Sequence, residues 1–211
     1  MKRIALILAG LCAMCAVAAA QDTWFAKDAG TKLNYQQTDA AGKVTNTFSY
    51  VVTSCTSEGG KTVINYDMIV PILDKPVSCN VWTEGGKFHS DASGSLGSVG
   101  SDIKVSGNAP IIPENPSIGA KLENCTLSIE SLATTADYTN VRISKHEEIT
   151  TPAGTFDAWC LEYDTATKMA FIKAVTKTEQ WMAKGVGVVK TVVKDKKGGI
   201  QSVTELASIE K

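Results

Sequence analysis

Hydrophobic and polar residues alternate with a period of two along most of the chain. Such alternation places every second side chain on the same face of a strand. The apolar faces consist of Val44, Phe48, Tyr50 and Val52 in residues 43–52, Ile64, Tyr66, Met68 and Val70 in residues 62–70, and Val141, Ile143 and Ile149 in residues 140–149. Because polar residues occupy the opposite faces, the pattern predicts antiparallel strands that are half buried.

Glycine-containing turns separate these alternating segments. They lie at residues 57–62, 83–87, 151–155 and 194–200, where short loops would join neighbouring strands into hairpins. No long segment has apolar residues at helical spacing. The sequence therefore predicts an all-β fold, with antiparallel strands forming a curved sheet, an open barrel or a two-sheet clam.

The first 20 residues have the composition of a secretory signal peptide. Lys2 and Arg3 precede an apolar run that ends in three alanines at 18–20. The run is shorter than the roughly 20 apolar residues of a membrane-spanning helix. We expect cleavage before Gln21, a single domain over residues 21–211 with no transmembrane segment, and export to the periplasm, the extracellular space or the cell surface.

Composition excludes some classes of partner for the mature chain. It would have 19 basic and 22 acidic side chains, a net charge of −3, so nucleic acid is not expected as a partner. Four cysteines remain, Cys55, Cys79, Cys125 and Cys160. An even number in an exported chain is compatible with disulfides, and the three complete pairings stay open.

Residues 90–117 differ from the rest of the mature chain. They are rich in Ser, Gly and Pro, which predicts an irregular loop or a crossover between two halves of the fold. Isolated apolar residues within this segment are the candidate contacts to a ligand or partner: Leu96, Val99, Ile103, Ile111 and Ile112.

Motifs for cofactors, metals and catalysis are incomplete. Gly59–Thr62 reads GGKT but lacks the upstream glycine of a phosphate-binding loop and precedes a strand. His146 begins HEEIT, without the second histidine of a zinc protease, and no G-x-S-x-G is present. We therefore expect no cofactor, no metal and no catalytic residue.

Cys160 raises one specific question, because it follows the Pro152–Thr155 turn closely enough to be a nucleophile placed by that turn. His146 would lie roughly opposite Cys160 in a hairpin around this turn, and a catalytic thiol needs such a base. Cys160 is, however, in phase with Phe156 and Ala158, as Cys79 and Cys125 are with their apolar neighbours. Burial or disulfide pairing is the favoured interpretation for all three cysteines.

Several segments together resemble a family of exported bacterial proteins common in Bacteroidetes, catalogued as a domain of unknown function and as TapB-like. The most specific are TPAGTF at 151–156 and W-x-x-K-G-V-G-V-V-K at 181–190, and the resemblance extends from Asp28 to Ile209. It implies an all-β extracytoplasmic domain with many antiparallel strands. It implies no activity, cofactor or catalytic residue.

Three functional hypotheses follow. The first is a non-enzymatic binding module that uses a sheet concavity or sheet edge for an unknown small ligand or envelope protein. The second is a structural or assembly component of the cell envelope. The third is a hydrolase that uses the strand carboxylates Glu147, Glu148 and Asp157.

Overall fold

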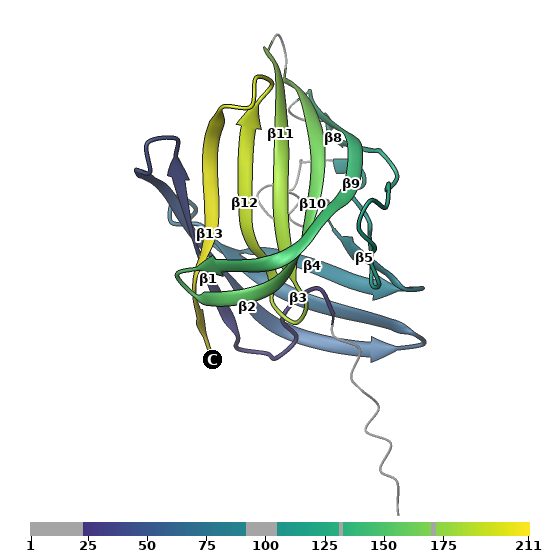
Figure 1. Cartoon of the computed structure of the whole chain (residues 1–211). Helices are drawn as coiled ribbons and strands as arrows, with labels where there is room; N and C mark the ends of the chain where they lie inside the picture. Colours follow the sequence, from purple (N-terminus) through teal and green to yellow (C-terminus); the bar gives the residue numbers. More distant parts are fainter. Residues whose placement is uncertain (1–22, 92–104, 131–132, 170–171) are drawn as a thin grey trace, which may run out of the picture.

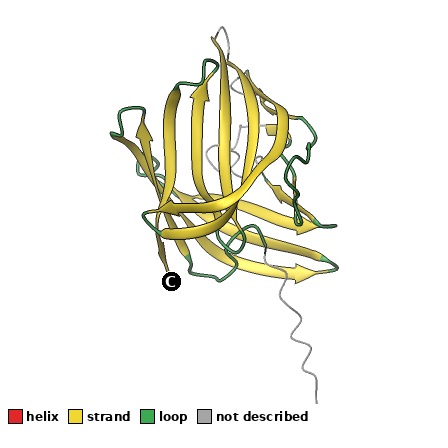
Figure 2. Cartoon of the chain, in the orientation of Figure 1, coloured by secondary structure: helices red, strands yellow, loops and turns green. Residues whose placement is uncertain are grey.

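The computed structural model describes residues 23–91, 105–130, 133–169 and 172–211, which form one antiparallel sheet of 13 strands. Figure 2 shows these strands joined by loops. The strands are β1 (Lys32–Asp39), β2 (Val44–Glu58), β3 (Lys61–Ile69), β4 (Val77–Glu84), β5 (Lys87–Ser90), β6 (Val105–Gly107), β7 (Ile112–Pro113), β8 (Cys125–Ile129), β9 (Thr134–Thr151), β10 (Gly154–Met169), β11 (Ile172–Ala183), β12 (Gly187–Asp195) and β13 (Ile200–Glu210). The all-β prediction is confirmed, and the predicted signal peptide, residues 1–20, lies outside the described residues.

The strand order is β6-β8-β9-β10-β11-β12-β13-β1-β2-β3-β4-β5-β7. Two runs of hairpin-connected strands, β1–β5 and β8–β13, therefore join where the first strand pairs with the last. In this seam Lys32 lies opposite Glu210 and Asp39 opposite Ser202, with one register shift after Asn34. The two paired strands that lie farthest apart in the sequence, β1 and β13, therefore pair in the middle of the sheet.

The sheet folds over itself, so that its two halves face each other. We call β1–β5 with β7 the N-terminal half, and β6 with β8–β13 the C-terminal half. Figure 1 shows β10–β13 standing upright, whereas β2–β4 run across below and behind them. Of the predicted architectures, a strongly curved sheet that is not closed describes the structure, because β6 and β7 are its two edge strands.

All four predicted hairpin turns are confirmed. Gly59 and Gly60 join β2 to β3, and Gly85 and Gly86 join β4 to β5, each with a positive φ that glycine adopts without a steric penalty. The turns at 151–155 and 194–200 join β9 to β10 and β12 to β13.

Two residues depart from the predicted apolar faces. Val44 is 46% exposed, because it lies at the end of β2 next to the β1–β2 turn, away from the core. Ile149 is partly buried and packs against the core as expected of an apolar position, but it lies on the opposite face from Ile143 because β9 contains a register shift. Leu161 pairs with Ile143 whereas Cys160 pairs with Lys145, so Ser144 is an extra residue and the alternation inverts beyond it.

The segment predicted as a loop or crossover connects the two edges of the sheet. β6 pairs with β8 at one edge and β7 pairs with β5 at the other, and only residues 108–111 separate β6 from β7. A chain advances at most about 3.6 Å per residue, so these edges lie within roughly 18 Å of each other. Within the described part of this segment, residues 105–107 and 112–113 form the two edge strands, and residues 108–111 link them.

A short segment before β1 is buried in the core. Thr23, Trp24, Phe25 and Ala26, which we call the N-terminal plug, are each at most 6% exposed. The indole Nε1–H of Trp24 donates to the carbonyl of Pro113 at 3.0 Å, and the amide of Gly185 donates to the carbonyl of Thr23 at 2.7 Å. The plug thereby links the C-terminal half to the edge strand β7. The largest other side chains with less than 2% exposure are Leu33, Val52, Ile64, Val77, Val141, Ile143, Cys160, Val189 and Leu206.

Candidate functional site

A cavity of about 280 Å³ lies between the two halves of the sheet. We call it the inter-half cavity. Its lining comprises Tyr50, Tyr66, Val81, Phe88, Ser90 and Ile112 from the N-terminal half or its edge, Tyr138, Leu161, Tyr163, Gln180, Met182 and Val188 from the C-terminal half, Phe25 from the plug, and Ala109 and Pro110 from the bridge between the edge strands. Its volume is at the small end of the range for ligand pockets, roughly 300–1,000 Å³.

Strand geometry explains how these side chains reach the same space. Leu161 and Tyr163 are two residues apart on β10, and Gln180 and Met182 are two residues apart on β11, so each pair shares a face. Leu161 is also directly opposite Gln180 in the β10–β11 register. The cavity side of the C-terminal half is therefore continuous across neighbouring strands.

The wall formed by the N-terminal half is aromatic. The ring of Tyr66 lies 4.8 Å from that of Phe25 and 5.1 Å from that of Tyr50, measured between centroids. Tyr50 in turn contacts Tyr35 at 5.1 Å and Phe48 at 5.4 Å. Tilted ring pairs at these separations are favourable and hold one another in place. This wall is a rigid surface of rings.

Two further tyrosines face it from the C-terminal half. Tyr138 on β9 and Tyr163 on β10 make an edge contact, with ring centroids 5.6 Å apart and planes at 67°. Both side chains line the cavity. Hydroxyl groups and aromatic faces are thus available on opposite walls.

Burial keeps these phenols neutral. It raises the pKa of Tyr50 to about 12, with a further contribution from Cys79. It also raises the pKa of Tyr66, Tyr138 and Tyr163 above the ordinary tyrosine value. At physiological pH the cavity therefore presents uncharged hydroxyls. Among the described lining residues none is Asp, Glu, Lys or Arg.

The candidate contacts predicted from sequence are only partly brought to this site. Ile112 is buried and lines the inter-half cavity. Ile111 instead lines a separate pocket with Lys87, Leu122 and Glu123. The remaining three, Leu96, Val99 and Ile103, lie outside the described residues.

Cys160 is fully buried, at 0% exposure, and lies opposite Lys145 and Trp181. Burial raises the pKa of its thiol, although a hydrogen bond from Ser144 and the charge of Lys145 act in the other direction. His146 does not face Cys160 as expected. The two-residue turn pairs Thr151 with Gly154, and in that register His146 lies opposite Trp159 and stacks on its ring at 3.9 Å between centroids. His146 is therefore not the residue paired with the thiol.

The other cysteines are also thiols, and no disulfide joins the four described ones. Cys79 is buried on β4, as expected from its phase with Val77 and Val81. Cys125, expected inside, and Cys55 are half-buried.

The carboxylates of the hydrolase hypothesis lie on the β9–β10 hairpin. Glu147 accepts a hydrogen bond from the indole of Trp181 at 2.9 Å, and Asp157 pairs with His146 at 2.7 Å. Glu148 lies opposite Asp157 in the register, whereas Glu147 is on the other face. Within the described residues no group of three or more His, Cys, Asp or Glu side chains is arranged to hold a metal ion.

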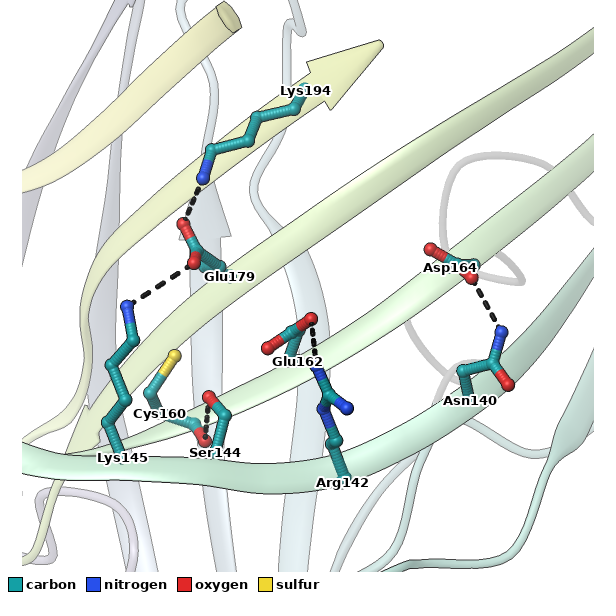
Figure 3. A network of polar contacts seen from close by, with 9 residues as sticks. All are labelled: Asn140, Arg142, Ser144, Lys145, Cys160, Glu162, Asp164, Glu179 and Lys194. Atoms are coloured by element: carbon teal, nitrogen blue, oxygen red, sulfur yellow. Dashed lines mark hydrogen bonds and ion pairs between the residues drawn. The ribbon is translucent and has the colours of Figure 1, made fainter. Parts of the chain in front are cut away.

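Charged side chains on the opposite face of β9–β12 form a separate network, shown in Figure 3. Glu179 accepts from Lys194 at 2.5 Å and from Lys145 at 3.4 Å, and Arg142 pairs with Glu162 at 2.7 Å. Burial acts to raise the pKa of Glu179, but the Lys194 hydrogen bond and the Lys145 charge outweigh it and lower the pKa. Since Glu179 alternates with the cavity residue Gln180, this network braces the C-terminal half from outside.

Sequence reasoning missed most of the cavity lining. The alternation of hydrophobic and polar residues placed Tyr50 and Tyr66 on apolar faces. That pattern did not show that these faces lie across a cavity from the C-terminal half. The plug residue Phe25 follows closely after the predicted signal peptide, where no strand was expected. Gln180 lies between Glu179 and Trp181 in β11, and nothing in this local pattern marks it as a cavity residue.

Comparison with known proteins gives a family and a fold. Residues 28–206 match the model of a family described as DUF3108-like. The structure is similar to that of a Bacteroides fragilis protein described as exported and as having a YmcC-like fold. The TM-score is 0.73 and the identity 18%, over 90% of this chain and 100% of that one. It is also similar to a protein from Parabacteroides distasonis described as a lipoprotein, with a TM-score of 0.72 and 22% identity over 90% of this chain and 99% of the other.

At these identities the two solved structures establish the fold alone. The search of curated proteins gave no match. In the part of the chain that the structure describes, no helix has the length and apolar character needed to cross a membrane.

Proposed function

The chain belongs to the DUF3108-like family, and from that premise we propose that it is an exported binding protein that holds a small molecule in the inter-half cavity. The observation that carries this proposal is the cavity itself, which is lined from both halves by aromatic and aliphatic side chains with a few polar groups. That combination is the usual composition of ligand sites.

Export is supported by the signal-like composition of residues 1–20 and by the descriptions of the two similar structures as exported and as a lipoprotein. The sequence segments shared with TapB-like proteins of Bacteroidetes agree with this location. The proposal places the protein outside the cytoplasm, in the periplasm or at the cell surface.

A binding function is preferred to hydrolysis because two of the three candidate carboxylates have structural partners. Glu147 is held by Trp181 and Asp157 by His146, and all three lie on the β9–β10 hairpin rather than in the cavity. The proposed function therefore involves no catalytic step.

The neutral fluorophore N-phenyl-1-naphthylamine tests the proposal, because its emission rises in an apolar site. Ala109 lines the cavity from the bridge between the edge strands, so Ala109→Trp should fill the cavity from its rim. Its neighbour Asn108 is exposed and does not line the cavity, so Asn108→Trp is the matched control.

We expect saturable binding by the wild type and the control, and at least a tenfold loss in A109W with an unchanged melting temperature. Ser90→Trp provides a second filling variant from β5 if A109W is unstable. Equal binding by all three tryptophan variants, or none by the wild type, would contradict a ligand site in this cavity.

A role in envelope assembly is the second candidate, and one surface feature favours it. The β3–β4 connection exposes Ile72 at 87%, together with Leu73 and Ile69. Exposed apolar clusters of this kind often contact other proteins. If this loop mediates self-assembly, sedimentation velocity should show concentration-dependent oligomers that the double variant I72S/L73S abolishes. A monomer at all concentrations would remove this support.

A further inference from the structure

Four polar side chains of the inter-half cavity have no hydrogen-bond partner among the described residues. They are the amide of Gln180 and the hydroxyls of Tyr50, Tyr138 and Ser90. Their neighbours in the cavity differ, because Tyr66 bonds with Cys79 and Tyr163 with Thr178. The described residues thus satisfy some of the polar groups that line the cavity and leave the amide and these hydroxyls available to a ligand.

Unsatisfied polar groups in an apolar surrounding are costly, and native proteins contain few of them. No described side-chain nitrogen or oxygen that is shielded from solvent lacks a partner. The polar atoms of Gln180, Tyr50 and Tyr138 are therefore accessible from the cavity itself. A ligand there can donate to and accept from the amide and both hydroxyls.

The described lining of the cavity offers no charge that would compensate an ion. It contains no acidic or basic side chain, and its tyrosines are neutral at physiological pH, with burial raising their pKa values still further above that range. Transfer of an unpaired ion into such a site carries a large desolvation cost. Aromatic and aliphatic side chains make up most of the remaining lining, including Phe25, Phe88, Leu161 and Met182.

Building on the proposed function, we infer that the ligand is an uncharged molecule with an apolar ring or acyl chain that carries hydroxyl or carbonyl groups. Its polar groups bond to Gln180, Tyr50 and Tyr138, and its apolar body contacts the rings of the N-terminal half. The apolar body of the ligand could be either an acyl chain or an aromatic or alicyclic ring. Matched pairs of compounds distinguish these two kinds of ligand.

The experiment compares two pairs of probes at pH 7.5 by displacement of the fluorophore. 1-Octanol and octanoate share a linear alkyl chain, and 4-hydroxybiphenyl and biphenyl-4-carboxylate share a biphenyl ring system. We expect the neutral member of at least one pair to displace the fluorophore at tenfold lower concentration than its anion. The pair whose neutral member displaces the fluorophore shows whether the apolar body of the ligand is a chain or a ring. An anion that competes as well as its neutral partner overturns the inference, as does a failure of both neutral probes in protein that binds the fluorophore.

Variants test the hydrogen bonds separately. Gln180→Leu and Tyr138→Phe keep the approximate shape of each side chain and remove its polar group. We expect each to weaken binding of the preferred neutral probe about fivefold to tenfold, with less than a twofold change for the fluorophore. Gln201→Leu, at an exposed position of β13, is the matched control and should change neither. Unchanged affinity for the neutral probe in both cavity variants overturns the inference. A wild-type protein that does not bind the fluorophore would instead reject the proposed function.

Discussion

Replacement of Phe25 by alanine should destabilise the protein and alter its ligand site at the same time. Phe25 is buried in the N-terminal plug, its ring lies 4.8 Å from Tyr66, and it lines the inter-half cavity. Removal of the ring deletes contacts to both halves of the sheet. The backbone bonds of the plug, such as Gly185 N–H to Thr23 O, do not involve the side chain and should remain.

The size of the effect follows from the burial. A buried Phe→Ala substitution costs about 3–5 kcal/mol, from lost transfer free energy and the space left behind. Because the ring borders an existing cavity, the neighbours lose fewer contacts than in a closed core, and we expect about 3 kcal/mol. For a domain of this length each kcal/mol lowers the melting temperature by roughly 2–4 °C, so the expected fall is about 6–12 °C. Val44→Ala, at a 46% exposed position, is the control and should change stability by less than about 0.5 kcal/mol.

A double-mutant cycle with Gly187 tests the contact itself. A Cβ at Gly187 would lie 3.1 Å from Cδ2 of Phe25, and the φ of +114° adds strain for any other residue. Gly187→Ala should therefore cost more in the wild type than in the F25A background, where only the backbone strain remains. Urea unfolding of the four proteins measures this coupling. Additive effects, or a melting temperature within 2 °C of wild type for F25A, would refute the described packing of the plug.

Three further outcomes are expected. The stabilisation that depends on Tyr50 should be constant below about pH 10 and be lost as the pH rises to about 12, since the unfolded state releases the Tyr50 proton near pH 10 and the folded state near 12. Tyr50→Phe should shift the alkaline midpoint, followed by circular dichroism, to higher pH, and an unshifted midpoint would contradict this. Gly107→Ala should cost more free energy of unfolding in urea than Gly119→Ala, because an added Cβ at 107 would lie 1.9 Å from a backbone oxygen of β8, whereas at 119 it meets nothing; equal costs would count against it. Native alkylation of Cys160 should be much slower than that of half-buried Cys55, and rapid selective labelling of Cys160 at neutral pH would reverse our assignment.

The fold class could be predicted from the sequence because local patterns determine strands and turns. Period-two alternation and paired glycines identified the hairpins, and the phase of Cys160 with Ala158 indicated its burial correctly. The error at Ile149 has a definite cause. One extra residue at Ser144 inverts every later side chain of β9, and alternation alone does not show where such a residue lies.

The site was less predictable because it depends on contacts between distant segments. Tyr50 and Tyr138 are 88 positions apart and reach one cavity only when the two halves face each other. The local sequence of each strand does not show that the two side chains come together. The candidate Ile112 lines the cavity because its segment links the two edge strands, whereas the next residue back, Ile111, lines a different pocket, since successive residues of an extended chain point to opposite sides.

The seam between β1 and β13 imposes an order on biogenesis. Residues 32–39 are synthesised long before residues 202–210, so a nascent chain carries β1 with only β2 beside it until the last strand is released. Each run of hairpins can pair early, but the edge of β1 stays exposed to foreign strands in the meantime, a hazard typical of contacts with large sequence separation. Completion of the sheet then becomes a late step of folding, which must follow the synthesis of β2–β12. Truncation within residues 200–210 would consequently impair both halves at once, since it would remove the strand that pairs with β1 of the N-terminal half and with β12 of the C-terminal half.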